Sequence, residues 1–314
     1  MIFPFLFQRF WRKIVSVKGM RTMNTRDLQY FVALVKYKNY TQVAKLFKVS
    51  QPTITQSIQR LEREFNTQLI RKDRVHRDEM VTRSGMMLFE NAKLINKKID
   101  LAHQEISRAN KRQIRFGLPP IIGKMAISQL VESLPDDLLQ RLKIVSVGSH
   151  DLLKQLQDGK IDIAVLGSNN LIDEPGIYAH LVTSLPFNII VSDHHPLAKR
   201  GAVSFKELAD ERFVNFDHQY VHYAALQAYC TYAGIKPQMV AYRMPDISWI
   251  KELVRQDFGI SLMVKNAIQN EPGIVALDIQ DPIPVSFTIS VAVREGYVLS
   301  PEEETLVDRL KELK

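Results

Sequence analysis

The sequence of 314 residues predicts a multidomain α/β protein, in which a winged helix-turn-helix and one long linker helix precede a region of alternating strands and helices. Three observations predict this fold. Apolar residues recur with helical spacing as far as residue 65, they then repeat about every 3.5 positions over residues 88–106, and strands alternate with helical patterns from residue 114 onward. A composition of 46% hydrophobic and 24% charged residues is typical of a soluble globular protein.

The first expected helix begins at Asp27 and ends near Asn39. Its apolar residues follow the i, i+3, i+4, i+7 spacing of a helix that buries one stripe: Leu28, Phe31, Val32 and Val35. Thr41 is the expected N-cap of a second short helix, because a Thr hydroxyl accepts hydrogen bonds from the free amides at a helix start. The apolar residues of this second helix are Val43, Ala44 and Phe47.

A tight turn at Lys48 and Val49 leads to a third helix, for which Ser50 is the expected N-cap. Pro52 falls in the first turn of this helix, where its missing N–H does no harm. Asn66 can adopt the left-handed conformation that ends a helix. The buried seam of the third helix consists of Ile54, Ile58 and Leu61. Two short helices with so short a connection make a helix-turn-helix.

The outer face of the third helix is rich in Gln, Thr and Arg, whereas ordinary solvated helix faces carry Lys and Glu. Gln can bond to adenine, Thr can meet a thymine methyl group, and Arg can bind guanine or phosphate, all in a major groove that admits one α-helix. The alternative is a solvated face that merely lacks Glu. The residues expected to contact double-stranded DNA from this module are Thr41, Ser50, Gln51, Pro52, Thr53, Thr55, Gln56, Gln59, Arg60 and Arg63.

The distribution of charge favours the DNA interpretation. Lys and Arg outnumber Asp and Glu two to one in residues 23–113, whereas the acidic residues are in excess after residue 113. This division suggests a polyanion-binding module joined to a domain with another task. A basic run between Arg71 and Arg77, with an extended stretch after it, predicts a two-stranded wing along the phosphates, although such a run can also be a solvated loop. The expected wing contacts are Lys72, Arg74, His76 and Arg77.

Residues 84–111 are expected to form one long helix that pairs with another copy of itself. A strict heptad seam is typical of helices that associate with other helices rather than with a broad core. A homodimer would present two reading helices to two half-sites of promoter DNA. The polar stretch 108–113 is a candidate hinge. The seam residues are Leu88, Ala92, Ile95, Ile99, Ala102 and Ile106.

The alternation of strands and helices after residue 114 predicts parallel α/β sheets. Ligands of such sheets bind beyond the carboxyl ends of the strands. Ser149 is also a suitable N-cap for the helix that follows it, whose first-turn amides could hold an anion; plain capping without a ligand is the alternative. The residues expected in these ligand-binding loops are Pro119, Pro120, Ile121, Gly148, Ser149, Gly167, Ser168, Phe216, Asp217 and His218.

Over nearly the whole of residues 23–314 the sequence resembles the LysR-type transcriptional regulators. The resemblance rests on MNTRDLQYFVAL at 23–34, VAKLFKVSQPTITQSIQRLEREF at 43–65 and QLIRKD…VTRSG at 68–85. It implies a DNA-binding regulator with a two-lobed effector domain similar to a periplasmic binding protein. The implied partners are promoter DNA, a small-molecule effector, RNA polymerase and further copies of the chain, as a homodimer or homotetramer. Four residues depart from the family pattern: Gln56, Asn66, Lys72 and Asp257.

The resemblance also divides the chain. It implies an N-terminal extension (1–22), a winged helix-turn-helix (23–83), a dimerising linker helix with a hinge (84–113) and an effector-binding domain (114–314). Within the effector domain, lobe one comprises residues 114–185 and 286–314, and lobe two comprises residues 186–285.

The combination of YKNYTQVAKLFKVSQPTIT with RVHRDE is similar to the regulators of malolactic operons in lactic acid bacteria. This similarity implies L-malate or a related carboxylate as the effector. Amides and hydroxyls at Ser149 and Ser168 suit a carboxylate, although none of the candidate loops contributes an Arg. The other readings left open are a binding protein for small molecules with an incidental basic front end, and a structural DNA-bending protein with a degenerate sensor.

Other site types find little support. The sequence contains no GxSxG, phosphate loop or GxGxxG, so we expect no enzyme activity, no catalytic residues and no cofactor. His194 and His195 precede a proline in an expected surface turn without a regular third metal ligand. Cys230 is the single cysteine, which excludes a disulfide framework, predicts a buried apolar thiol and indicates a cytoplasmic protein. The first 22 residues fit neither a signal peptide nor a membrane span and are expected to be a disordered extension or an upstream start, with a membrane-surface helix as the alternative.

Overall fold

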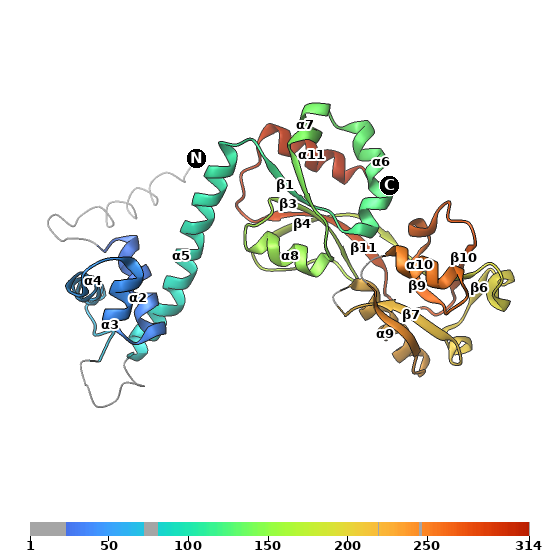
Figure 1. The fold of residues 1–314 in the computed structure, drawn as a ribbon, viewed down its shortest axis with the longest axis horizontal. Helices are drawn as coiled ribbons and strands as arrows, with labels where there is room; N and C mark the ends of the chain where they lie inside the picture. Colours follow the sequence, from blue (N-terminus) through green and yellow to red (C-terminus); the bar gives the residue numbers. More distant parts are fainter. Residues whose placement is uncertain (1–22, 72–80, 219, 245–246, 314) are drawn as a thin grey trace, which may run out of the picture. The chain divides into compact units, whose positions relative to one another are not determined.

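The computed structural model describes residues 23–71, 81–218, 220–244 and 247–313 (Figure 1). The chain forms two compact units, and the boundary between them falls after His103, inside the long helix α5. None of the helices in the described ranges is long and apolar enough to cross a membrane.

The N-terminal unit is helical. Its core joins the apolar stripes of the first three helices to the start of the fourth, with Phe31, Leu34, Val43, Ile54 and Leu61 fully buried. This arrangement confirms the predicted helix-turn-helix. The helices are α2 (Thr25–Tyr37), α3 (Tyr40–Phe47), α4 (Gln51–Glu64) and α5 (Arg83–Ala109).

Local capping explains where α2 and α3 begin and end. Asn24 caps α2 through a reciprocal pair of hydrogen bonds with Asp27, each 3.0 Å long. Lys38 ends α2 in the left-handed conformation, at φ 51°. The N-cap of α3 is Asn39, whose side chain accepts a hydrogen bond from the amide of Gln42. The prediction of Thr41 as the N-cap is therefore wrong: Thr41 lies exposed in the first turn of α3.

The start of α4 follows the sequence prediction. The Ser50 hydroxyl accepts from the amide of Thr53, and Pro52 occupies the first turn. Lys48, at φ 55°, makes the tight turn before α4, and Asn66, at φ 46°, adopts the predicted left-handed conformation after it. The third helix of the motif thus begins and ends where its capping residues predict.

The first sheet of the C-terminal unit contains five strands in the order β2-β1-β3-β11-β4. Their bounds are β1 (Ile114–Gly117), β2 (Leu142–Val145), β3 (Ile163–Ser168), β4 (Ile177–Leu185) and β11 (Phe287–Arg294). β1 pairs in parallel with β2 and β3, but β11 runs antiparallel to both β3 and β4. The prediction of parallel sheets is confirmed for β1, β2 and β3 but is wrong for β11 and β4, because β11 returns to this sheet from the second one and not through a helical crossover.

Helices cover both faces of the first sheet (Figure 1). Alternate residues of β3 serve different cores: Ala164 and Leu166 pack under α8 (Ser149–Gln157), whereas Ile163 and Val165 face the opposite layer. That layer is formed by α6 (Pro120–Ser133), α7 (Asp136–Arg141) and α11 (Pro301–Lys311).

The second sheet has the strand order β6-β10-β5-β9, with the parallel pair β7-β8 beside it. The chain passes from the first sheet to the second between Leu185 and Phe187, and it returns over residues 280–286. The bounds are β5 (Phe187–Ser192), β6 (Ala202–Val203), β7 (Arg212–Phe216), β8 (Gln238–Met244), β9 (Ser261–Val264) and β10 (Ile274–Ile279). The remaining elements are α9 (Val221–Ala233), α10 (Ile247–Arg255) and the 3₁₀ turns η2 (Pro196–Lys199), η3 (Phe205–Leu208) and η4 (Lys265–Ile268).

Candidate functional sites

The outward face of α4 carries uncharged hydrogen-bonding side chains. Thr53 and Thr55 are half-buried and are held in place, since the hydroxyls of Ser50 and Thr53 lie 2.8 Å apart and the Gln51 amide donates to the Thr55 hydroxyl at 3.2 Å. Further along the helix the long side chains are open to solvent. The exposed members of the predicted set on α4 are Gln51, Pro52, Gln56, Gln59 and Arg63.

Arg60 does not belong to this open face. Its Nε donates to Oδ2 of Asp27 at 3.0 Å, and its Nη2 donates to Oδ1 of the same carboxylate at 2.5 Å. The Asp27 side chain is fully buried, and only 20% of the Arg60 side chain is exposed. The prediction of Arg60 as a DNA contact is therefore corrected: the guanidinium joins α4 to α2.

The sequence reading missed the buried partners of Arg60. The hydroxyl of Ser57, inside the apolar seam of α4, donates to Oδ1 of Asp27 at 2.7 Å. Burial alone would raise the pKa of Asp27, but the hydrogen bonds from Arg60, from the Asn24 backbone and from Ser57 outweigh it and lower this pKa below 3.8. A polar Ser57 beside Ile58 in the seam was the one signal that pointed to a buried partner.

The predicted wing contacts Lys72, Arg74, His76 and Arg77 lie outside the described residues. On either side of them Ile70 and Val81 form an antiparallel bridge. The Glu62 carboxylate of α4 accepts from the amides of Leu69 and Ile70, at 2.9 and 3.2 Å, and so fixes the chain that leads away from α4.

The predicted seam of α5 is only partly open to a partner. Ala92 is fully buried and Leu88 packs beside it, both against the core of the N-terminal unit. These two residues are therefore corrected to core positions, because the helical domain occupies the start of the seam. Ile95, Ala102 and Ile106 are exposed and Ile99 is half-buried. Three further exposed apolar side chains on this helix were missed: Met86, Met87 and Leu94.

In the C-terminal unit, five of the predicted ligand residues meet around one small cavity. Its volume is about 20 Å³, which is room for about one water molecule. Tyr220, Val221, His222 and Phe287 complete the lining, and the sequence reading missed all four. The predicted residues in the lining are Pro119, Pro120, Ile121, Gly148 and Ser149.

Ser149 has another role than the predicted one. The N-cap of α8 is Gly148, and the Ser149 hydroxyl instead accepts a hydrogen bond of 2.8 Å from the amide of Gly167. The predicted cap at Ser149 is thus wrong. Gly167 must be a glycine, because a Cβ there would lie 2.8 Å from the ring of Phe287. The bond ties the end of β3 to the start of α8, beside the cavity.

The remaining predicted ligand residues do not line this cavity. The Ser168 hydroxyl donates to the carbonyl of Asn170 at 2.6 Å. Asp217 and His218 form an ion pair, and 70% of the His218 side chain is exposed. Phe216 is buried behind the lining, where its ring stacks on Tyr220 with centroids 4.7 Å apart.

His222 is the buried titratable group of the lining. Aromatic rings surround it, with centroid distances of 5.0 Å to Phe216, 5.3 Å to Phe287 and 5.6 Å to Phe187. Burial lowers its pKa to about 3, so the imidazole is neutral at physiological pH. Its Nε2 atom is buried without a hydrogen-bond partner, as is the Oδ1 atom of Asn169.

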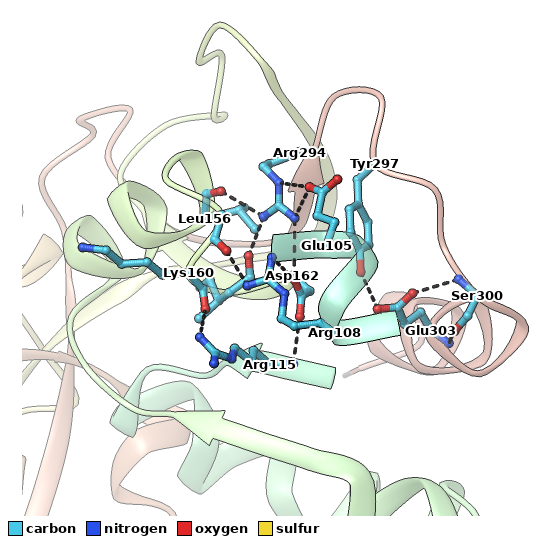
Figure 2. Close-up of polar contacts among 12 residues, drawn as sticks. Glu105, Arg108, Arg115, Leu156, Lys160, Asp162, Arg294, Tyr297, Ser300 and Glu303 are labelled. Atoms are coloured by element: carbon cyan, nitrogen blue, oxygen red, sulfur yellow. Dashed lines mark hydrogen bonds and ion pairs between the residues drawn. The ribbon is translucent and has the colours of Figure 1, made fainter. Parts of the chain in front are cut away.

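A polar network fixes the last turns of α5 to the first sheet (Figure 2). Arg294, at the end of β11, donates to the Glu105 carboxylate at 3.1 and 2.9 Å and to the carbonyls of Leu156 and Ile161. Arg108 donates to the Gly159 carbonyl at 2.6 Å and lies 3.3 Å from the buried carboxylate of Asp162. Arg108 is therefore anchored, and it does not belong to the predicted hinge at 108–113.

The rival sites find no support in the structure. His195 caps the turn η2, since its Nδ1 accepts from the amide of Leu197, and His194 is 88% exposed. Among the residues that the structure describes, no group of three His, Cys, Asp or Glu side chains could hold a metal ion. Cys230 is buried, and burial raises its pKa to about 11, which suppresses the reactive thiolate.

Two family models match the chain. The model "Bacterial regulatory helix-turn-helix protein, lysR family" covers residues 25–86, and the model "LysR substrate binding domain" covers residues 107–314. A similar protein is the "Malolactic fermentation system transcriptional activator" of Lactococcus lactis, which is 32% identical over 296 residues, or 93% of this chain and 100% of the relative.

Solved structures of similar fold are also known. The "Corynebacterium glutamicum OxyR C206 mutant" superposes with a TM-score of 0.54 at 21% identity, covering 94% of both chains. The "Effector binding domain of QuiR in complex with shikimate" superposes with a TM-score of 0.54 at 20% identity, covering 63% of this chain and 94% of the other. At these identities the likeness concerns the fold.

Proposed function

Because this chain belongs to the LysR family of DNA-binding transcriptional regulators, we propose that it activates transcription from a promoter when L-malate or a related carboxylate occupies its effector domain. The family models and relatives describe transcriptional regulators and not enzymes, which confirms the sequence prediction on that point. A DNA-binding regulator acts where the chromosome lies, which in a bacterium is the cytoplasm.

In this proposal the exposed face of α4 reads base edges in the major groove. The observation that carries it is the solvent exposure of Gln56, Gln59 and Arg63 on a helix whose opposite face is fully packed. Gln can bond to adenine and Arg to guanine or phosphate. The Asp27–Arg60 pair joins α4 to α2, which fixes the helix that carries the base-reading side chains.

The chain is proposed to act as a homodimer or homotetramer. LysR regulators act as oligomers, and α5 exposes Met87, Leu94, Ile95 and Ile106. Pairing along α5 would remove these apolar side chains from water and present two reading helices to two half-sites.

The domain layout predicted from the sequence is retained as part of the proposal. The first sheet uses strands from residues 114–185 and 287–294, and the second sheet uses strands from 187–279, which agrees with lobe boundaries near 185 and 286. An effector held between the lobes would favour one arrangement of them, which would change the spacing of the DNA-binding helices and the bend of the promoter. RNA polymerase is the partner expected to respond to that bend.

The choice of L-malate rests on the relative from Lactococcus lactis, which is named for malolactic fermentation. Gly148 and Ser149, at the start of α8, line the cavity. The free amides at the start of a helix favour negative charge, which supports a carboxylate ligand there. Calorimetric titration of the full-length protein with L-malate, citrate and pyruvate tests this choice. Binding of none of the three would refute a carboxylate effector.

Footprinting on the DNA upstream of the gene for this protein and of neighbouring genes tests the regulatory role. We expect protection of a defined promoter site whose extent or bend changes when L-malate is added. A protein that only binds small molecules would protect nothing. A structural DNA-bending protein would protect any sequence equally, with a steep dependence on salt.

A further inference from the structure

His222 is a buried polar side chain that lines the small cavity and has one ring nitrogen without a hydrogen-bond partner. It lies in the first turn of α9 and is 1% exposed, and its Nε2 atom lacks a partner. A buried polar atom without a partner is rare and energetically unfavourable. His222 lines the same cavity as Gly148 and Ser149 at the start of α8. An imidazole in this position is therefore available to a ligand.

A second buried polar atom without a partner belongs to Asn169, which is hydrogen-bonded to the start of α9. Asn169, directly after β3, donates through its Nδ2 to the carbonyl of Val221 at 3.2 Å, while its Oδ1 is buried without a partner. Asn169 is thus tied to the residue that precedes His222, but it does not line the cavity. Of the two buried unpartnered atoms, only the Nε2 atom of His222 belongs to a residue in the lining.

Among the residues that the structure describes, no Lys or Arg lines the cavity beside His222. Phe187, Phe216 and Phe287 pack on its ring, and burial is the cause of its lowered pKa. Titratable or charged groups on the elements that meet at the cavity include Tyr220 and Tyr223 at the start of α9, Asp217 and His218 after β7, His150 and Asp151 in the first turn of α8, Lys124 on α6 and Arg294 at the end of β11. A carboxylate that entered alone would therefore be a buried charge without a countercharge, which is strongly unfavourable.

We propose that His222 takes up one proton when the effector carboxylate binds, so that an imidazolium and a carboxylate form a neutral pair in the cleft. This inference rests on the proposed carboxylate effector. The proton comes from solvent, the Nε2 lone pair forms the new N–H bond, and that N–H donates to the carboxylate. This pair adds no net charge to the aromatic surroundings, and the second carboxylate of L-malate, which is also ionised in this pH range, lies outside the pair.

The consequence is that the effector domain responds to acid and effector together. Because one proton binds with each ligand, the affinity rises about tenfold for each unit by which the pH falls, as long as the free imidazole is neutral and the bound one is charged. The present cavity admits about one water molecule, so it must widen to admit the ligand.

The test uses the full-length protein and L-malate as the probe, by isothermal titration calorimetry at pH 6.5 and 7.5 in buffers of different ionisation enthalpy. We expect an uptake of about one proton per ligand and an affinity about tenfold higher at pH 6.5. His222→Gln should remove both the uptake and the pH dependence. The matched control is His194→Gln, because His194 is exposed and does not belong to the lining, and it should behave like the unsubstituted protein.

Nuclear magnetic resonance of labelled histidine keeps the test independent of whether His222→Gln folds. In the free protein the His222 imidazole should stay neutral from pH 7.5 to 5, and saturating L-malate at pH 6.5 should convert it to the imidazolium. Binding without proton uptake, or uptake that survives in His222→Gln, overturns the role of His222 alone. Failure of L-malate, citrate and pyruvate to bind at all refutes the carboxylate effector, and the inference with it.

Discussion

Replacing Arg60 by Ala is expected to loosen the N-terminal unit without removing a DNA contact. The substitution deletes two charge-assisted hydrogen bonds and leaves the fully buried carboxylate of Asp27 with only Ser57 and the Asn24 amide as donors. Removing one partner of a buried ion pair typically costs 3–5 kcal/mol. Because two other donors remain, we expect a loss near the lower limit, about 3 kcal/mol.

The loss should depend on pH with a defined sign. The folded-state pKa of Asp27 lies below 3.8, so its contribution to stability is present above that value and disappears as the pH falls through the lower, folded value. Without Arg60, only the hydrogen bonds from the Asn24 backbone and Ser57 oppose the effect of burial, so we expect the pKa of Asp27 to rise. The difference between Arg60→Ala and the unsubstituted protein should therefore be largest at neutral pH and shrink below about pH 4.

Hydrogen exchange of the α2 and α4 amides in the full-length protein measures this loss. About 3 kcal/mol corresponds to exchange roughly a hundredfold faster or more. Arg63→Ala is the matched control, because Arg63 is exposed on the same helix and should weaken DNA binding without faster exchange. If Arg60→Ala left the exchange unchanged and weakened DNA binding as Arg63→Ala does, Arg60 would be a DNA contact and the assignment as a brace would be wrong.

Three further outcomes are expected. Gln56→Ala should weaken operator binding by about 1–3 kcal/mol and spare random DNA in a filter-binding assay, whereas Gln227→Ala, an exposed Gln on α9, should change neither; equal losses on both DNAs would exclude base reading by Gln56. Arg294→Met should speed hydrogen exchange of the backbone amides around Glu105, because the Arg294–Glu105 pair loses its cation. Unchanged exchange would show that other contacts hold this turn of α5. Cys230, with its pKa raised to about 11, should resist iodoacetamide at pH 8 until the protein unfolds, and rapid labelling of the native protein would contradict its burial.

The features that the sequence predicted are those that depend on near neighbours in the chain. Ser50 and Pro52 define the start of α4 within one turn, and the periodicity of Ile54, Ile58 and Leu61 defines its buried side. Where two neighbours could fill one role, the sequence was ambiguous. Asn39 and Thr41 can both cap a helix, and the left-handed turn at Lys38 decides for Asn39.

The features that the sequence did not predict join residues far apart in the chain. Arg60 meets Asp27 across 33 positions, and Arg294 meets Glu105 across 189. A charged side chain on a helix pattern is normally solvated, so periodicity alone places it outside. Nothing in the local sequence indicated that His222 of α9 is buried, because its burial depends on rings from three strands: Phe187, Phe216 and Phe287. The loops of the cleft could be predicted from strand ends, but their polar chemistry could not.

The two strands that border the cleft also hold the end of α5. At one end of the β3–β11 pair, Gly167 bonds to Ser149 and Phe287 packs on His222. At the other end, Asp162 precedes β3 and Arg294 closes β11, and these residues hold Arg108 and Glu105 of α5 (Figure 2). Six paired residues at about 3.3 Å each span roughly 20 Å, and backbone hydrogen bonds join the two strands along this length. A ligand that displaced Phe287 or Gly167 would therefore act on the same strands that fix α5, whereas a ligand bound elsewhere on the second sheet would not contact them.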